Sequence, residues 1–208
     1  MIYFATPSSP VAIAHMRDRT LGWIDTPNQA NIRPDDVLWC ADNGCYTETF
    51  NETQWWRWLV KHAGHAGMCA FATAPDVLGD HQATLTRSAP WLPRIRDLGY
   101  PAAFVAQDGA TFDAMPWQDF DVLFIGGTDT FKFSWDAITI SRHARRRGKW
   151  IHYGRINSQR RWRLARAVGA QSADGTFLKF APDQNMIRLT RWLEDLHQPG
   201  LFTLAGEP

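Results

Sequence analysis

The segment Gln171-Ser-Ala-Asp174-Gly-Thr176 places one carboxylate, that of Asp174, at the end of a short strand-like run. A matching segment occurs earlier, Val37-Leu-Trp-Cys-Ala-Asp42-Asn-Gly44, where Asp42 follows a continuous apolar run. Such runs are typical of parallel strands that are buried on both faces. In a β/α barrel, catalytic side chains gather at the carboxyl ends of the strands. Two carboxylates in this position suit a covalent exchange, in which one attacks and the other moves a proton.

Apolar strands alternate with amphipathic helices from position 37 onward, which predicts an α/β fold with parallel strands. Two earlier strand candidates, 2–7 and 21–25, bring the count to about eight, the number that closes a barrel. The alternative is an open doubly wound sheet, which would gather polar turns at one switch point. Here nearly every predicted strand ends in a polar or glycine turn. We therefore predict one domain, 1–208, forming a compact TIM-like (β/α)8 barrel whose second helix is replaced by the loop 26–36.

The remaining elements follow from the same periodicity and from helix caps. Further strands are predicted at 68–72, 102–106, 122–125, 150–153 and 170–173. Helices are predicted at 10–19, from Asn51 onward, at 80–98 with a break near Pro90 and Pro93, and at 117–120, 134–147, 157–168 and 183–197.

The charge distribution is uneven although the net charge is only +1. The segment 142–166 carries many Arg and Lys residues and no Asp or Glu, which favours a polyanionic partner over a merely solvated helix face. No apolar run is long enough for a membrane, and no signal peptide is recognisable. The cysteines, Cys40, Cys45 and Cys69, form no zinc signature and are predicted to be reduced thiols of a cytoplasmic protein.

The strand-end motifs resemble, in order, those of the tRNA-guanine transglycosylase superfamily. Ala41-Asp42-Asn43-Gly44-Cys45-Tyr46 is similar to its Thr-Asp-Ser-Gly-Gly-Phe element, and Val105-Ala-Gln107-Asp108-Gly109 to its Val-Gln-Gly-Gly strand end. Phe124-Ile-Gly126-Gly127 resembles Ile-Gly-Gly-Leu. Ile151-His-Tyr-Gly154-Arg155, a helix, and Gly169-Ala-Gln-Ser-Ala-Asp174 resemble the Tyr-Leu-Met-Gly-Val-Gly, helix, Gly-Ile-Asp-Met-Phe-Asp series. The resemblance extends over 37–176.

The departures from this pattern point to one branch of the superfamily. The C-terminal zinc site is missing, and the Phe-Asp-Glu-Cys element is replaced by Phe71-Ala-Thr-Ala-Pro-Asp76. This reduced form is more similar to the DNA-modifying 7-deazaguanine transglycosylases of phages and bacteria (DpdA-like). The resemblance implies DNA and a 7-deazaguanine base such as preQ0 as substrates, in the host cytoplasm if a phage encodes the protein. It implies neither a metal nor another cofactor.

The resemblance also implies roles for individual residues. Asp174 would trap the sugar covalently, and Asp42 would transfer the proton of the base. Base recognition would fall to Asn43, Asp76 (or Asp108), Gln107, Gly126 and Gly127. Nucleic-acid contacts would fall to Arg155, Ser158, Arg160 and Arg161.

Other functions remain open at this point. The same chemistry on tRNA, an N-glycosidase that only releases the base, and a non-catalytic barrel that binds nucleic acid or a nucleoside all fit the pattern. Taken alone, Asp42-Asn-Gly44 and Asp174-Gly175 are also ordinary turn sequences.

Overall fold

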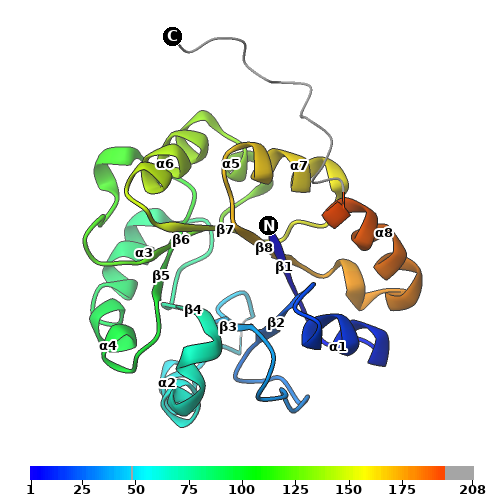
Figure 1. Ribbon diagram of the computed structural model, residues 1–208. Coiled ribbons are helices and arrows are strands. Elements are labelled where there is room, and N and C mark those ends of the chain that lie inside the picture. The colour runs from blue at the N-terminus through cyan, green and yellow to red at the C-terminus, as the bar shows by residue number, and fades with distance from the viewer. Residues whose placement is uncertain (48, 195–208) are drawn as a thin grey trace.

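The chain forms a closed barrel of eight parallel strands in the order of the sequence, which confirms the predicted fold class (Figure 1). The computed structural model describes residues 1–47 and 49–194. The barrel closes where the first strand pairs with the last, with Ile2 opposite Ser172 and Phe4 opposite Asp174. The strands are β1 (Ile2–Ala5), β2 (Gly22–Asp25), β3 (Trp39–Ala41), β4 (Cys69–Thr73), β5 (Ala102–Ala106), β6 (Val122–Ile125), β7 (Trp150–Tyr153) and β8 (Ser172–Gly175).

Helices surround the barrel on its outside, as Figure 1 shows. They are α1 (Pro10–Arg17), α2 (Glu52–Lys61), α3 (His81–Ser88), α4 (Leu92–Asp97), α5 (Asp129–Lys132), α6 (Trp135–Arg146), α7 (Gln159–Ala167) and α8 (Pro182–Glu194), with short 3-10 helices η1 (Ala63–Met68), η2 (Phe112–Ala114) and η3 (Phe177–Lys179). The side chains of Asn51, Ser134 and Ser158 cap α2, α6 and α7. The sequence predicts a helix that starts at Asn51, in agreement with its cap.

The long connection between β2 and β3 contains no helix, as predicted. The guanidinium of Arg33 lies over the Trp39 ring, 3.9 Å from its centroid, and Arg33 Nε is 3.4 Å from Asp25 Oδ2. The loop therefore covers the outer face of β3 at the place where a helix would otherwise pack.

Side chains alternate between two apolar cores because successive residues of a strand point to opposite faces. Most large side chains lie between the barrel and the helices, Tyr3 and Trp23 among them. A smaller cluster around Phe4, Phe71 and Val122 forms a second core. The register places His152 opposite Ser172 and Phe4 opposite Asp174, so these positions belong to the inward set.

Several predicted boundaries were wrong. Residues 117–119 form a turn, and the short helix of this region is η2, which ends before Pro116. The last strand begins and ends two residues later than predicted, so Asp174 lies within β8. Helix α5, capped by Thr128, was not predicted. Of the predicted helix 183–197, positions 195–197 lie outside the described residues.

None of the helices within residues 1–47 and 49–194 is long and apolar enough to cross a membrane. Cys40, Cys45 and Cys69 are free thiols, and Cys40 and Cys69 are buried.

Gly22 tests the packing inside the barrel. It pairs with Phe4, and a Cβ at Gly22 would overlap the fully buried Phe4 ring. We expect Gly22→Ala to lower the free energy of unfolding by about 1–3 kcal/mol, because overpacking forces side chains off their rotamers. Thermal unfolding measures this effect. Gly64→Ala, where an added Cβ meets nothing within 4 Å, is the matched control and should leave stability unchanged or slightly higher.

Candidate active site

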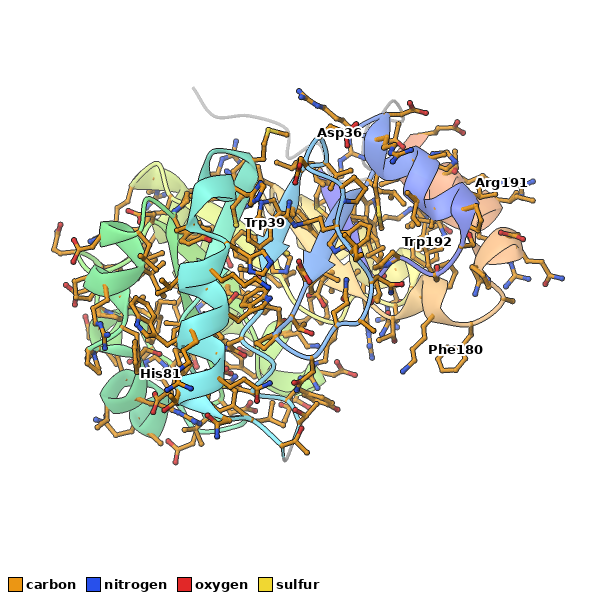
Figure 2. All side chains as sticks on the ribbon, turned by 90° about the horizontal axis from the view of Figure 1, so that it is seen from below. Asp36, Trp39, His81, Phe180, Arg191 and Trp192 are labelled. Carbon is orange, nitrogen blue, oxygen red and sulfur yellow. The ribbon has the colours of Figure 1, made fainter. Side chains whose placement is uncertain are left out.

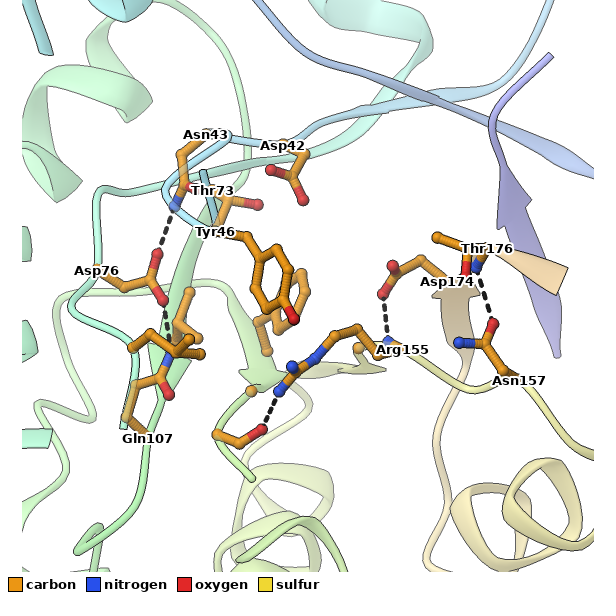
Figure 3. A pocket seen from close by; sticks show the side chains of 16 residues that line it. Asp42, Asn43, Tyr46, Thr73, Asp76, Gln107, Arg155, Asn157, Asp174 and Thr176 are labelled. Atoms are coloured by element: carbon orange, nitrogen blue, oxygen red, sulfur yellow. Dashed lines mark hydrogen bonds between the residues drawn. The ribbon is translucent and has the colours of Figure 1, made fainter. Parts of the chain in front are cut away.

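A cavity of about 360 Å³ opens at the carboxyl ends of the strands (Figure 3). It is lined by Asp42, Asn43, Tyr46, Thr73, Asp76, Leu78, Val105, Gln107, Phe124, Gly126, Gly127, Gly154, Arg155, Asn157, Asp174 and Thr176. Its volume falls within the range that is usual for small-molecule pockets. The barrel thus brings together both carboxylates singled out in the sequence, although 132 positions separate Asp42 from Asp174 (174 − 42 = 132).

Asp42 and Asp174 face each other across this cavity, as Figure 3 shows. Burial is the main reason why the pKa of Asp42 rises to about 7, and the negative charges of Asp174 and Asp76 raise it further. The Gly44 N–H donates to Asp42 Oδ1 at 2.6 Å and opposes this shift. A carboxyl group with a pKa near neutrality can both accept and donate a proton under physiological conditions.

One oxygen of Asp174 is occupied by the protein itself. Oδ1 accepts the backbone N–H of Arg155 at 3.1 Å and lies 3.1 Å from His152 Nε2. Arg155 has a φ of 58°, an uncommon conformation for a side-chain-bearing residue, and this conformation turns its N–H toward Asp174. Within the described part of the chain, no donor is hydrogen-bonded to Oδ2. The second oxygen is therefore available to a ligand.

Asp76, Asn43 and Gln107 form a polar platform in the same cavity. Asn43 Nδ2 donates to Asp76 Oδ1 at 2.8 Å and to the Ala74 carbonyl at 2.7 Å. Gln107 Nε2 donates to Asp76 Oδ2, while Gln107 Oε1 accepts from Gly79 N at 3.0 Å. Burial raises the pKa of Asp76, and the donors from Asn43 and Gln107 act against this rise. The two amides thus hold the Asp76 carboxylate in place while its remaining lone pairs stay available.

Two glycines allow the backbone to approach the cavity closely. A Cβ at Gly126 would lie 2.6 Å from Val105 Cγ1, and one at Gly154 would lie 2.6 Å from Phe124 Cε1. No other residue fits at either position without displacing buried Val105 or partly buried Phe124.

Some residues predicted for the site lie elsewhere. Asp108 does not line the cavity, because its carboxylate binds the backbone N–H of Thr128 at 2.8 Å and the Thr128 hydroxyl at 2.5 Å. Ser158 caps α7 through the Arg161 N–H at 3.4 Å. Arg160 is exposed, and Arg161 Nη2 pairs with Asp129 Oδ2 at 2.5 Å. Of the four residues predicted to contact nucleic acid, only Arg155 lines the cavity, and its guanidinium donates to the Gly127 carbonyl.

The site also contains residues that were not predicted. The Tyr46 ring lies 5.0 Å from the Arg155 guanidinium at the cavity wall and is 67% exposed. Thr73 is 2% exposed, and its buried hydroxyl has no hydrogen-bond partner within the described residues. His152, which was not among the predicted site residues, is fully buried beside Asp174. A polar residue in the inward position of an otherwise apolar strand was the available signal for His152.

Lys132 is fully buried but does not line the cavity. Its ammonium group donates to the Gly154 carbonyl at 3.1 Å and pairs with Asp129 at 3.1 Å. Burial disfavours the charged form of Lys132 and is the main reason why its pKa is lowered. The Lys132 bond to the Gly154 carbonyl connects α5 with the residue that follows β7, and the pair of Arg161 with Asp129 connects α5 with α7.

Comparison with known proteins gives the fold alone. No model of a protein family matches the sequence, and no curated protein matches it. Among solved structures, the chain is similar to the Amycolatopsis orientalis BexX/CysO complex, with 14% identity, a TM-score of 0.53, and coverage of 96% of this chain and 93% of that one.

Two further structures share the fold. The native KDPGal structure has 9% identity, a TM-score of 0.51 and coverage of 95% of each chain. A cube-shaped, porous protein cage, designed by fusing symmetric oligomeric domains, has 10% identity, a TM-score of 0.54, and coverage of 93% of this chain and 70% of that one. At these identities the similarity carries no information on activity.

Proposed function

We propose that this protein is a transglycosylase that exchanges guanine in DNA for a 7-deazaguanine base through a covalent intermediate with Asp174. The observation that carries the proposal is the pairing of Asp42 and Asp174 across one cavity, with the pKa of Asp42 near 7 and one Asp174 oxygen unoccupied. The choice of DNA and of a deazaguanine rests on the resemblance of the strand-end motifs to the transglycosylase superfamily.

The reaction would proceed in two displacements at C1′ of the sugar. In the first, Asp174 Oδ2 bonds to C1′ as the bond to the glycosidic nitrogen breaks, and the departing guanine takes the electron pair and a proton from Asp42. In the second, Asp42 removes the proton from the glycosidic nitrogen of the incoming base. That nitrogen bonds to C1′, and Asp174 leaves as a carboxylate. Each step needs Asp42 in the opposite protonation state, which a pKa near neutrality permits.

The platform around Asp76 fits the edge of guanine on which N1–H and the exocyclic amino group lie side by side as hydrogen-bond donors. The Asp76 carboxylate accepts from N1–H and the exocyclic amino group, and the free hydrogen of the Gln107 amide donates to the base carbonyl. Tyr46 offers an aromatic face to the ring, and the unpartnered Thr73 hydroxyl offers one further polar contact. A base in a duplex must leave the stack to enter such a cavity.

Incorporation of labelled base tests the proposal. Purified protein is incubated with guanine-containing DNA or with tRNA, together with radiolabelled guanine or 7-cyano-7-deazaguanine. We expect label to enter DNA. Label in tRNA instead would reassign the substrate, whereas free guanine released without incorporation would identify a glycosidase. No label and no released base from a folded protein would favour the binding barrel.

The basic segment gives a prediction on affinity. Arg142, Arg145 and Arg146 line a second hollow, of about 410 Å³, together with Ala167 and Val168. These residues lie at the carboxyl ends of α6 and α7, on the side of the barrel away from the cavity. We expect that replacing all three arginines with alanine weakens DNA binding and reduces the salt slope by about 0.9 per lost phosphate contact.

The measurement is DNA affinity across a salt series. The matched control replaces the exposed Arg17, Arg57 and Arg188 instead, which removes the same charge elsewhere. Equal affinity and equal slope for both triple variants would show that the hollow makes no phosphate contact.

A further inference from the structure

A chain of hydrogen bonds runs from Asp174 back into the barrel. His152 Nε2 lies 3.1 Å from Asp174 Oδ1, and His152 Nδ1 lies 2.8 Å from Ser172 Oγ. The indole N–H of Trp150 donates to the same Ser172 Oγ at 2.7 Å. His152 and Ser172 are fully buried, so water does not compete for these bonds.

The donors and acceptors of this chain fix the position of each hydrogen. An indole N–H can only donate, so Ser172 Oγ accepts the bond from Trp150. The hydroxyl hydrogen of Ser172 is then free to bond to His152 Nδ1, which must carry a lone pair. An ionised carboxylate can only accept, so the ring hydrogen of His152 lies on Nε2, facing Asp174. Every group in the chain is satisfied when the imidazole is neutral and protonated on Nε2.

Other protonation states of His152 leave this chain unsatisfied. In an imidazolium, Nδ1–H would also donate to Ser172, and within the described residues the Ser172 hydroxyl hydrogen would find no other acceptor. In the Nδ1–H tautomer, the lone pair of Nε2 would face the Asp174 carboxylate. The surroundings of the ring are apolar on several sides, with Phe124, Phe71 and Phe4 centroids 4.4, 4.9 and 6.0 Å from the imidazole centroid.

We infer that His152 is a positioning residue that holds Asp174 through Oδ1 and so makes Oδ2 the attacking oxygen, with Ser172 and Trp150 fixing the tautomer. The Arg155 N–H supplies the second bond to Oδ1, so the carboxylate is held from two directions. The part of this inference that concerns attack rests on the proposed function. The part that concerns the tautomer rests on the hydrogen-bond chain alone.

Nitrogen NMR tests the tautomer without any substrate. Correlation spectra of the imidazole nitrogens and their ring protons in ¹⁵N-labelled protein distinguish the Nε2–H, Nδ1–H and doubly protonated forms, and signals lost in His152→Gln identify His152. We expect the Nε2–H form at pH 7.5. The Nδ1–H form or an imidazolium would overturn the inference. An Nε2–H form in a protein that exchanges no base would support the hydrogen-bond chain and overturn only the proposed function.

Variant kinetics test the positioning role. In His152→Gln, the side-chain amide can replace the Nε2–H donor, whereas His152→Leu removes it at similar size. We expect the rate of sugar trapping to fall about 100-fold or more in His152→Leu, because small misplacements of a reacting group cost this much. His152→Gln should recover at least about tenfold of that loss. A His152→Leu protein that is folded and traps sugar as fast as the wild type would overturn the inference.

Ser172 provides a second, milder test if His152→Leu fails to fold. Ser172→Thr keeps the hydroxyl, and Ser172→Ala removes it and leaves the Trp150 N–H without an acceptor. We expect trapping to fall about tenfold or more in Ser172→Ala and to stay near the wild-type rate in Ser172→Thr, since only the former releases the imidazole ring. Equal rates for the two variants would overturn the role of Ser172 in fixing the ring.

Discussion

Replacing Asp174 with asparagine is expected to lower the rate of base exchange by about 10³-fold or more, equivalent to roughly 4 kcal/mol of activation free energy. Asparagine has the same size and keeps an oxygen that can accept the Arg155 N–H and the His152 N–H. It removes the negative charge and the nucleophilic oxygen. The loss should therefore fall on the chemical step and leave the affinity for nucleic acid within a few-fold of the wild type.

Single-turnover exchange and direct binding measurements separate these two effects. Asp97→Asn, an exposed carboxylate on α4, is the matched control and should behave as the wild type. If Asp174→Asn retains exchange, Asp174 is not the group that carries the sugar. If it loses binding and exchange together, Asp174 serves recognition rather than covalent chemistry.

Replacing Asp42 with asparagine is expected to change both the pH dependence of exchange and the stability of the protein. With the pKa of Asp42 at about 7, the first displacement needs the protonated form and should slow as the pH rises through 7. The second displacement needs the ionised form and should accelerate over the same range. Loss of general acid–base catalysis should cost about 10²–10⁴-fold in rate, and Asp42→Asn should show neither inflection.

Stability gives a check on Asp42 that needs no substrate. A carboxyl group whose pKa is raised by folding stabilises the native state at low pH and loses this contribution as the pH rises toward its folded pKa. Asp42→Asn should therefore match the wild type near pH 4. At pH 8 it should be more stable, by about 1–2 kcal/mol once solvent screening of a partly exposed group is allowed for. If the variant and the wild type were equally stable at both pH values, folding would not raise the pKa of Asp42.

Much of the fold was accessible from the sequence because parallel strands and amphipathic helices have distinct periods. The strand ends at Asp42 and Asp174 were also accessible, since a barrel collects such ends at one face. Helix α5 was missed because it has four residues and no apolar period. The predicted helix 117–120 was wrong: this short segment forms a turn in which the Trp117 ring packs against the Phe120 ring.

The details of the site depended on side-chain direction, which the sequence does not specify at loops. Gln107 and Asp108 are adjacent, yet Gln107 lines the cavity while Asp108 binds Thr128 outside it. Asp76 follows its strand by three positions and still reaches the cavity, where Asn43 and Gln107 bind its carboxylate. The predicted barrel already makes β7 and β8 neighbours, but the contact of His152 with Asp174 also required their register, with His152 opposite Ser172, which sequence periodicity does not give.

The most direct test of the central claim is to map the covalent intermediate. Wild-type protein is incubated with guanine-containing DNA in the absence of incoming base, denatured and digested, and the peptides are examined by mass spectrometry. The proposed mechanism predicts a deoxyribose adduct on the peptide that contains Asp174, with guanine released in equal amount. Released guanine without an adduct, or an adduct on another residue, would contradict it.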